Sequence, residues 1–427
     1  MVGPIQRCVC TSPDSWPVEI SKNVLLITRS YYPLNVASAH RPVKLAKFLP
    51  GFGWTPHVLT LDWTRRYAQR VYGFDCYDPL LVGQSPCETT CLPIRSYPKY
   101  SIKGILDRSY GKFSRYRVSW RLYRDLLNAA RDLVRQKSFD AILAESPSSW
   151  VLAIADQIAR ESRIAWVADL QDIPDELGGQ ITRAQWRQIR LEVATCKSAS
   201  AVIAMSRPLA DKLSARHTAP VHVVPYGFDP DDYPPAPDTK SEYFDIVYCG
   251  LVYGERNPAP LLDALDGILE EGKIDISRIR VRFYGEPPGR LAHLAAGRAC
   301  ANLVEAMGRV PLHEMIRIEQ QAAVLLMLPH PSAEGVVPSK IFDYLGARRP
   351  ILSVPGDQSV TDAIIQETGA GVIAPTAARV AEALEQWYSE WETTGTVGFR
   401  GVPGRMAVYT RKNQAQRMAQ ILDKVCK

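Results

Sequence analysis

The feature that most constrains the fold is an alternation of short apolar segments with amphipathic ones, which runs along nearly the whole chain. An apolar segment at 23–28 is followed by an amphipathic one at 41–49 and another apolar one at 57–61, which predicts a strand–helix–strand unit. Parallel sheets covered by helices on both faces produce this pattern. The sequence therefore predicts an α/β protein with doubly wound, Rossmann-like sheets.

The length of 427 residues indicates more than one domain, because single cores organise about 150 residues each. A stretch rich in proline and aspartate, 229–239, interrupts the rhythm, and such stretches are typical of domain boundaries. Further strands are expected at 139–144, 164–168, 201–204 and 221–224 before this stretch, and at 244–249, 279–284, 324–328 and 351–354 after it.

We therefore divide the chain into four segments. Residues 1–22 are an irregular N-terminus without the apolar core of a signal peptide. Residues 23–232 and 233–403 are two Rossmann-like domains that face a central cleft, and 404–427 form a final helix that packs toward the first domain. Ligands of such sheets bind at the carboxyl ends of the strands, so the cleft is the expected site.

The composition favours a cytoplasmic protein. No apolar run approaches the 18 or more residues of a membrane-spanning helix. The 9 cysteines are odd in number and scattered, which is typical of a reducing compartment. Neither their spacing nor the acidic residues predict a metal site, because the adjacent Asp231 and Asp232 lie in the linker rather than at a strand end.

The most informative motif is AEGVVPSKIFDYLGARRPIL at 333–352. A turn at Gly335 leads into a helix with Pro338 near its first position, so unpaired N–H groups at the helix start suit a diphosphate. Lys340 is expected to reach the phosphates or a sugar hydroxyl, and Asp343 to accept hydrogen bonds from a ribose. The alternative interpretation is an ordinary helix start with a solvated lysine and aspartate.

This motif resembles the E-x7-E region of family-4 GT-B glycosyltransferases, also called glycosyl transferases group 1. Three other segments resemble that family in the same order: 25–54, 206–229 with VPYGFD, and 248–256 with Gly250 and Arg256 in a G-x5-R pattern. The resemblance spans about 23–375. It implies the GT-B fold and transfer of a sugar from a UDP- or GDP-linked donor to a saccharide or lipid-linked acceptor, as in polysaccharide biosynthesis, with retention of configuration and without a metal or other cofactor.

The resemblance also implies site residues. Arg256 matches the basic residue that contacts the donor diphosphate, and a guanidinium there would stabilise the charge that grows on the leaving group. Gly308 and Val310 match the segment whose backbone pairs with the nucleobase. The expected donor-binding set is Gly250, Arg256, Gly308, Val310, Glu334, Gly335, Val336, Val337, Lys340 and Asp343.

The sequence departs from the family at three of its functional positions. The second glutamate of the E-x7-E region is Asp343, and Gly335 occupies the place of the first, with Glu334 one position away. The histidine of the first domain is absent, since the matching strand end reads Glu-Ser-Pro at 145–147. Catalysis could then depend on a carboxylate at a strand end, Asp172 or alternatively Asp169 or Glu145, and on His40 at the start of the first helix. The expected catalytic residues are therefore Arg256, Lys340, Asp172 and His40.

Three other functions were weighed. A nicotinamide dehydrogenase is disfavoured, because no G-x-G-x-x-G follows the first strand. A GT-B sugar-nucleotide epimerase or hydrolase would share the donor site, and a non-catalytic partner subunit would explain the departures from the family motif. The last two remain open from the sequence.

One segment, 95–137, is unusually basic and aromatic. It holds 12 lysines and arginines against 3 aspartates. Its net charge of +9 exceeds the +6 of the whole chain. Interleaved aromatic side chains and cations favour peripheral contact with an anionic membrane, on the inner face of the cytoplasmic membrane. The alternative is a solvated helix whose aromatics pack inward; no nucleic-acid module is visible, so no nucleic-acid partner is expected.

Overall fold

The structure, a computed structural model, describes residues 7–8, 21–94, 101–113, 118–146, 149–176, 179–235, 241–272, 274–285 and 288–426. The expected N-terminal segment 1–22 and parts of the basic segment, 95–100 and 114–117, lie largely or wholly outside these residues. The chain packs as two units. The first contains residues 1–225 and 411–427, and the second contains residues 226–410.

The first unit is built on one sheet with the order β1-β4-β3-β2-β5-β6-β7-β8. All neighbouring strands are parallel except β1, which pairs with β4 in the antiparallel direction. The order reverses between β2 and β5, so the sheet is doubly wound, and ligands of such sheets bind at this reversal. The strands are β1 (Arg7–Cys8), β2 (Lys22–Ile27), β3 (Trp54–Asp62), β4 (Glu88–Pro93), β5 (Ala141–Glu145), β6 (Ala165–Asp169), β7 (Ala201–Ala204) and β8 (Val221–Val223).

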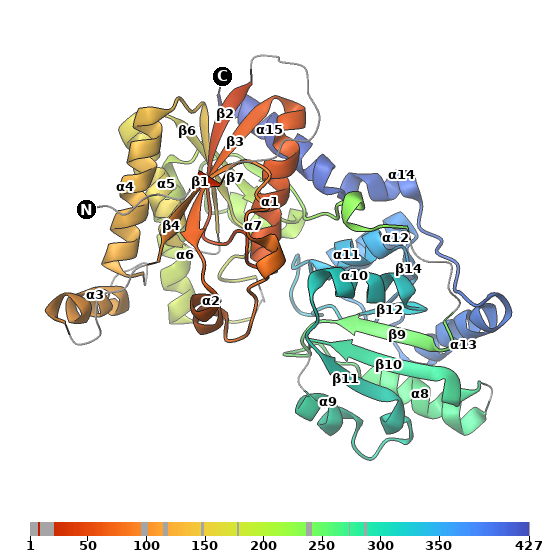
Figure 1. Ribbon diagram of the computed structural model, residues 1–427. Coiled ribbons are helices and arrows are strands. Elements are labelled where there is room, and N and C mark those ends of the chain that lie inside the picture. Colours follow the sequence, from red (N-terminus) through yellow and green to blue (C-terminus); the bar gives the residue numbers. More distant parts are fainter. Residues whose placement is uncertain are drawn as a thin grey trace. The chain divides into compact units, whose positions relative to one another are not determined.

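Helices cover both faces of this sheet, as Figure 1 shows for α4 and α5 on one side and α1 and α15 on the other. The residues Val24 to Ile27 of β2 are completely buried, which requires cover on both faces. The last helix, α15, packs on α1, and Lys22 at the start of β2 forms an ion pair of 2.6 Å with Asp423. The helices are α1 (Ala37–Phe48), α2 (Arg65–Tyr72), α3 (Ile102–Phe113), α4 (Trp120–Gln136), α5 (Ser149–Ser162), α6 (Arg183–Thr195), α7 (Arg207–Ser214) and α15 (Arg411–Val425).

The second unit is built on a parallel sheet with the order β11-β10-β9-β12-β13-β14, which reverses between β9 and β12. Residues of β9 alternate between two cores: Phe244, Ile246 and Tyr248 pack on one face, and Val247 and Cys249 on the other. The strands are β9 (Phe244–Cys249), β10 (Ile279–Tyr284), β11 (Val304–Gly308), β12 (Val324–Met327), β13 (Ile351–Ser353) and β14 (Gly371–Ile373).

Two layers of helices cover the second sheet (Figure 1). Leu261 and Leu265 of α8 and Trp387 of α13 belong to the first core, whereas Ile341 of α11 and Ile365 of α12 belong to the second. The helices are α8 (Ala259–Glu271), α9 (Pro288–Ala295), α10 (Leu312–Gln321), α11 (Lys340–Ala347), α12 (Val360–Thr368), α13 (Ala377–Thr394) and α14 (Pro403–Met406).

The predicted fold class is confirmed, since two doubly wound Rossmann-like sheets are present. Two local details differ from the sequence prediction. The first unit ends at Pro225 rather than at Asp232, because Phe228 N–H already donates to the Tyr409 carbonyl of the second unit at 3.0 Å. The helix expected to start near Pro338 begins at Lys340.

No helix in the described part of the chain combines the length and the apolar character needed to cross a bilayer. Within the same part, no cluster of three or more histidine, cysteine, aspartate or glutamate side chains is placed to hold a metal ion. The cysteines whose side chains are described are free thiols: Cys76, Cys87, Cys91, Cys196, Cys249, Cys300 and Cys426.

Candidate functional site

The carboxyl ends of three neighbouring strands in the second sheet run into glycines. Gly250 follows β9, Gly285 follows β10 and Gly308 ends β11. The φ angles of Gly285 and Gly308 are 92° and 70°, which L side chains rarely adopt. Gly250 N–H donates to the Tyr284 carbonyl at 2.8 Å, and a β-carbon on Gly285 would lie 3.6 Å from the Gly250 carbonyl oxygen. The three glycines leave this edge of the sheet without side chains of its own, and at Gly250 the side chains of Lys340 and Tyr248 approach the backbone.

Lys340 lies over this bare backbone. A β-carbon at Gly250 would lie 2.9 Å from Cε of Lys340, so the lysine side chain passes directly above the glycine. Lys340 is the first residue of α11, whose first turn receives no side-chain cap. In α12, by contrast, the carboxylate of Asp357 accepts N–H groups of the first turn, at 2.9–3.1 Å from Ser359, Thr361 and Asp362. The start of α11, unlike that of α12, offers backbone dipoles and a cation to an anion.

Arg256 lies six residues after Gly250 and stacks on an aromatic side chain. Its Cζ is 4.6 Å from the centroid of the Tyr253 ring. It also lies beside Tyr248, whose pKa burial raises to about 12 while the Arg256 guanidinium opposes that rise. The Nε of Arg256 is buried and has no hydrogen-bond acceptor among the described residues. A buried donor without an acceptor is costly, and a phosphate oxygen would satisfy it.

Asp343 lies one turn into α11 and is partly buried. Its neighbour is Glu319 of α10, which is 3% exposed. Burial raises the pKa of Glu319 to about 8, the Asp343 carboxylate adds to this rise, and Lys340 opposes it. Cys249, the last residue of β9, hydrogen bonds to the Glu319 carboxyl. These contacts show that Lys340 and Asp343 share one electrostatic environment with a buried acid.

The remaining residues predicted to bind the donor lie on the loops of the same unit. Glu334 is exposed, whereas Gly335 is buried, has a φ of 88° and donates its N–H to the Ser359 hydroxyl at 3.4 Å. Val336 N–H donates to the Ala333 carbonyl at 3.1 Å, and Val337 packs at the margin of the core beneath α11. Val310 packs at the margin of the same core, just after Gly308. The predicted donor-binding residues therefore belong to one folded unit.

Arg41 and Asp169 form a completely buried ion pair at the carboxyl edge of the first sheet. Arg41 belongs to α1, and Asp169 is the last residue of β6. The Nε and Nη2 of Arg41 donate to the two carboxylate oxygens at 2.6 and 3.0 Å. Nη1 also donates to the carbonyls of Val224 and Pro225, at 3.2 and 3.3 Å. The pair joins α1, β6 and the segment with which the first unit ends.

Glu145 lies beside this pair, at the end of β5 and in register with Asp169. Its side chain is buried, and burial together with the neighbouring Asp169 carboxylate raises its pKa well above the usual range. Thr28 lies nearby, but its hydroxyl donates to the Ser30 carbonyl at 3.1 Å, and neither oxygen of Glu145 has a hydrogen-bond partner among the described residues. Asp169 and Glu145, considered as alternatives to Asp172, are therefore enclosed groups rather than free carboxylates.

Asp172 and His40 lie on the two elements that this ion pair connects. Asp172 follows β6 by three residues and has an exposed side chain, although the surrounding protein still raises its pKa through desolvation. His40 precedes Arg41 on α1, and its Nε2 is 3.1 Å from Oδ1 of Asn35. Glu176, further along the loop that carries Asp172, has a pKa raised to about 7 by burial and then by Asp172. The predicted catalytic residues are thus divided, with Asp172 and His40 in the first unit and Arg256 and Lys340 in the second.

Sequence reasoning missed two residues that shape these sites. Glu319 precedes the run Gln-Gln-Ala-Ala and looks like an exposed helix position, so no local signal predicts its burial. Arg41 is not among the residues that the sequence singles out. A charged residue within an apolar helical stripe is a signal for a buried ion pair, but its partner is 128 residues away.

Solved structures of glycosyltransferases share this architecture. HepE from Anabaena, solved with UDP, matches with a TM-score of 0.61 and 15% identity over 94% of this chain and 100% of its own. Sucrose-phosphate synthase from Thermosynechococcus elongatus matches with a TM-score of 0.59 and 15% identity over 94% and 98%. WaaG, a glycosyltransferase involved in lipopolysaccharide biosynthesis, matches with a TM-score of 0.53 and 13% identity over 94% and 98%. The chain has the GT-B fold of glycosyltransferases.

The sequence itself also matches a family. Residues 37–227 match the family described as glycosyl transferase 4-like domain, which covers most of the first unit. The first unit therefore resembles this glycosyltransferase family, and the family resemblance predicted from the motifs is confirmed. No curated protein matches the chain.

Proposed function

We propose that this protein is an active glycosyltransferase that moves a sugar from a nucleotide-sugar donor to a saccharide or lipid-linked saccharide acceptor. The observation that carries the proposal is the position of Lys340, which lies over bare backbone at Gly250 and begins a helix without a cap. HepE has been solved with UDP and with UDP-glucose. We therefore propose a UDP-linked hexose as the donor.

Two parts of the donor, the diphosphate and the ribose, have partners of suitable chemistry in the second unit. The start of α11, Lys340 and Arg256 offer positive charge to the diphosphate, and negative charge on the diphosphate grows as the glycosidic bond breaks. The carboxylate of Asp343 would accept hydrogen bonds from the ribose. Because two cations and a helix start would meet the leaving group, we propose transfer without a divalent metal or other cofactor. The resemblance to family-4 glycosyltransferases supports retention of configuration, which we propose on that ground alone.

The first unit would hold the acceptor. Asp172 is exposed beside the strand edge, and desolvation raises its pKa. A carboxylate whose pKa moves toward neutrality is better suited to accept a proton from an acceptor hydroxyl. We propose Asp172 as that base and His40 as a residue that contacts the acceptor.

A thermal-shift panel of nucleotide sugars tests the donor. We expect a UDP-hexose to raise the melting temperature, because a ligand at a hundredfold excess over its Kd stabilises the folded state by about 2.7 kcal/mol. The Asp343→Asn variant should bind UDP about 1–3 kcal/mol more weakly, since a charged hydrogen-bonding partner of the ribose is lost. Glu270→Gln, which neutralises an exposed carboxylate of α8, is the control and should bind UDP as the wild type does.

The donor assignment fails if no UDP- or GDP-linked sugar shifts the melting temperature at millimolar concentration. The ribose assignment fails separately if Asp343→Asn and Glu270→Gln bind UDP equally well. Release of free sugar from the donor without transfer to any added acceptor would support the hydrolase alternative instead.

We also propose that α3 attaches the protein to the inner, anionic face of the cytoplasmic membrane. Figure 1 shows α3 projecting beyond α4 and away from the sheet of its unit. Ile102, Ile105 and Leu106 have exposed fractions of 78%, 51% and 63%, and their spacing places them along one side of the helix. The ring of Tyr110 packs 5.3 Å from that of Trp120, at the base of this helix. An exposed apolar stripe within a basic segment is suited to an anionic lipid surface.

Vesicle sedimentation tests this attachment. We expect the double variant Ile105→Glu, Leu106→Glu to reduce binding to vesicles that contain phosphatidylglycerol by more than tenfold, because burial of each apolar side chain contributes about 1.5–3 kcal/mol. Leu80→Glu changes an equally exposed leucine outside α3 and should leave vesicle binding unchanged. Equal binding by the wild type and the double variant would contradict the proposal without affecting the donor site.

A further inference from the structure

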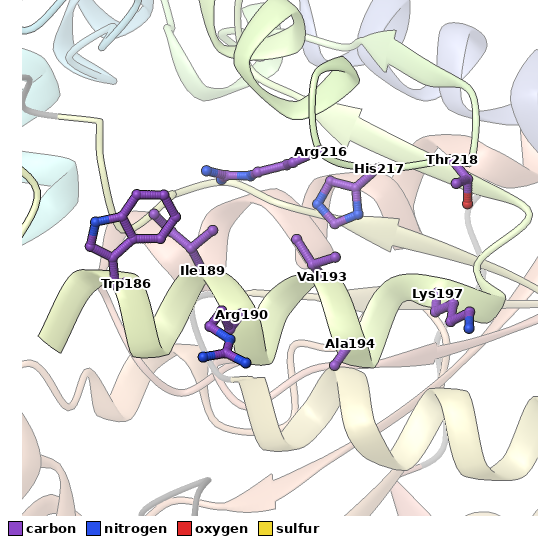
Figure 2. Close-up of a pocket in the computed structure, with 9 residues that line it drawn as sticks. All are labelled: Trp186, Ile189, Arg190, Val193, Ala194, Lys197, Arg216, His217 and Thr218. Carbon is purple, nitrogen blue, oxygen red and sulfur yellow. The ribbon is translucent and has the colours of Figure 1, made fainter. Parts of the chain in front are cut away.

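A pocket of about 480 Å³ lies in the first unit between α6 and the turn that follows α7. In Figure 2, Trp186, Ile189 and Val193 extend from α6 toward Arg216 and His217 of that turn. The size is within the range of small-ligand sites. The residues that line the pocket are Trp186, Ile189, Arg190, Val193, Ala194, Lys197, Arg216, His217 and Thr218.

The indole of Trp186 is 53% exposed, which is unusual for so large an aromatic side chain in a folded unit. Ile189 is buried at the floor of the pocket, next to this indole. An exposed aromatic surface beside a concavity is typical of ligand-binding sites, because the flat ring provides apolar contact at little entropic cost. The pocket therefore has a stacking platform at one end.

The lining is positively charged. It contains Arg190, Lys197 and Arg216 and no acidic residue. Two ion pairs fix the guanidinium of Arg216. Its Nη1 is 2.9 Å from Oδ1 of Asp175, and its Nη2 is 2.9 Å from Oε1 of Glu192. Among the described residues no carboxylate forms an ion pair with Arg190 or Lys197, whose charges face solvent. The pocket thus presents one fixed guanidinium and two uncompensated cations.

The charged and aromatic groups lie along α6 and the short 3-10 turn, Cys196–Ser198, that follows it. Trp186, Arg190 and Ala194 recur at four-residue spacing on α6, which places them about 12 Å apart from first to last, and Lys197 follows in the 3-10 turn. This length exceeds a single small anion, and the small side chain of Ala194 leaves space between the cations. A ligand with several charged groups and apolar ring faces fits this pattern.

We propose that this pocket binds an anionic oligosaccharide, with a sugar ring stacked on Trp186 and its carboxylate or phosphate groups on Arg190 and Lys197. The choice of a saccharide rests on the proposed glycosyltransferase function, whereas the choice of a negative charge rests on the lining alone. Asp175, which holds Arg216, lies in the loop that also carries Asp172. The pocket is therefore connected, through Arg216 and Asp175, to the loop of the proposed acceptor base, and would bind a distal part of an acidic acceptor.

Titration calorimetry with the full chain tests the proposal with three probes. They are a short oligogalacturonate, a neutral malto-oligosaccharide of equal length, and tripolyphosphate. We expect the oligogalacturonate to bind most tightly, because it alone combines ring faces with negative charge. Tripolyphosphate binding as tightly, with no loss in Trp186→Ala, would show a site for charge only and overturn the saccharide.

Variants of exposed residues on α6 locate the binding. Trp186→Ala and Arg190→Ala should each weaken oligogalacturonate binding by roughly tenfold, through loss of stacking and of a charge-assisted hydrogen bond. Arg187→Ala removes an exposed arginine of the same helix that does not line the pocket, and should have no effect. The pocket is excluded if Arg187→Ala weakens binding as much as Arg190→Ala.

These results can be separated from the donor site. UDP binding is measured on the same variants and should be unchanged in all three. Normal UDP binding without oligogalacturonate binding would overturn the pocket alone, whereas oligogalacturonate binding without any nucleotide-sugar binding would overturn the proposed function alone.

Discussion

Replacement of Asp169 by asparagine should lower the free energy of unfolding by about 3–5 kcal/mol, because it leaves the guanidinium of Arg41 buried without its counter-ion. Both side chains are 0% exposed, so no solvent can compensate. Two other acceptors of Arg41, the carbonyls of Val224 and Pro225, are neutral. Denaturant unfolding followed by circular dichroism measures the loss.

Glu161→Gln provides a matched control. Arg131 holds Glu161 with the same two-pronged geometry, at 2.6 and 2.8 Å, but both side chains are substantially exposed. Exposed ion pairs contribute at most about 1 kcal/mol, so this variant should be close to the wild type. Equal losses in Asp169→Asn and Glu161→Gln would show that burial does not determine the effect.

Variants of Glu145, which lies beside the ion pair of Arg41 and Asp169, provide a second test of this prediction. Burial and then the Asp169 carboxylate raise the pKa of the Glu145 carboxyl well above the usual range, and it lies close enough to Arg41 to interact with its charge. In Asp169→Asn, the Asp169 charge that helps to raise this pKa is absent, so ionisation of Glu145 would supply part of the lost negative charge, and the expected loss of about 3–5 kcal/mol is what remains. Glu145→Gln alone should therefore cost little, whereas the double variant should lose more than the sum of the two single variants.

The fold was predictable because its signal is local. Apolar strands such as Leu25 to Ile27 are buried on both faces, and the sequence shows this as a continuous apolar run. The end of the first unit was less predictable. The proline-rich stretch predicts a boundary at Asp232. The second unit starts earlier because Phe228 N–H donates to the carbonyl of Tyr409, which is far along the chain.

The candidate sites also contain some features that could be predicted from the sequence and others that could not. The loop from Gly335 to Asp343 could be predicted, because a glycine, a helix start and a carboxylate occur within a few residues of one another. The pairing of Arg41 with Asp169 could not, since the two are 128 residues apart and nothing in either segment identifies the other as its partner. Burial of Glu319 depends on the packing of α10 beside β9 and α11, which no helical pattern reveals.

Replacement of Arg256 by alanine should reduce kcat more than tenfold, which corresponds to at least about 1.4 kcal/mol of lost transition-state stabilisation. The guanidinium stacks 4.6 Å from the Tyr253 ring, which holds it in place, and its buried Nε has no acceptor among the described residues. Charge on a leaving diphosphate is greatest in the transition state, so the loss should appear in kcat more than in KM. Arg256→Lys should recover only part of the activity, because an ammonium cannot make two parallel hydrogen bonds to a phosphate.

Arg278→Ala is the control that separates chemistry from packing. Arg278 also stacks on an aromatic ring of the second unit, with its Cζ 4.4 Å from the centroid of the Trp391 ring, but it precedes β10 and lies at the amino end of that strand. Loss of this stacking should change stability slightly and leave kcat unchanged, because the diphosphate is expected at the carboxyl ends of the strands. Initial rates with the donor found in the thermal-shift panel measure both variants. If Arg256→Ala retains the wild-type kcat, or if Arg278→Ala loses as much, Arg256 does not contact the leaving group.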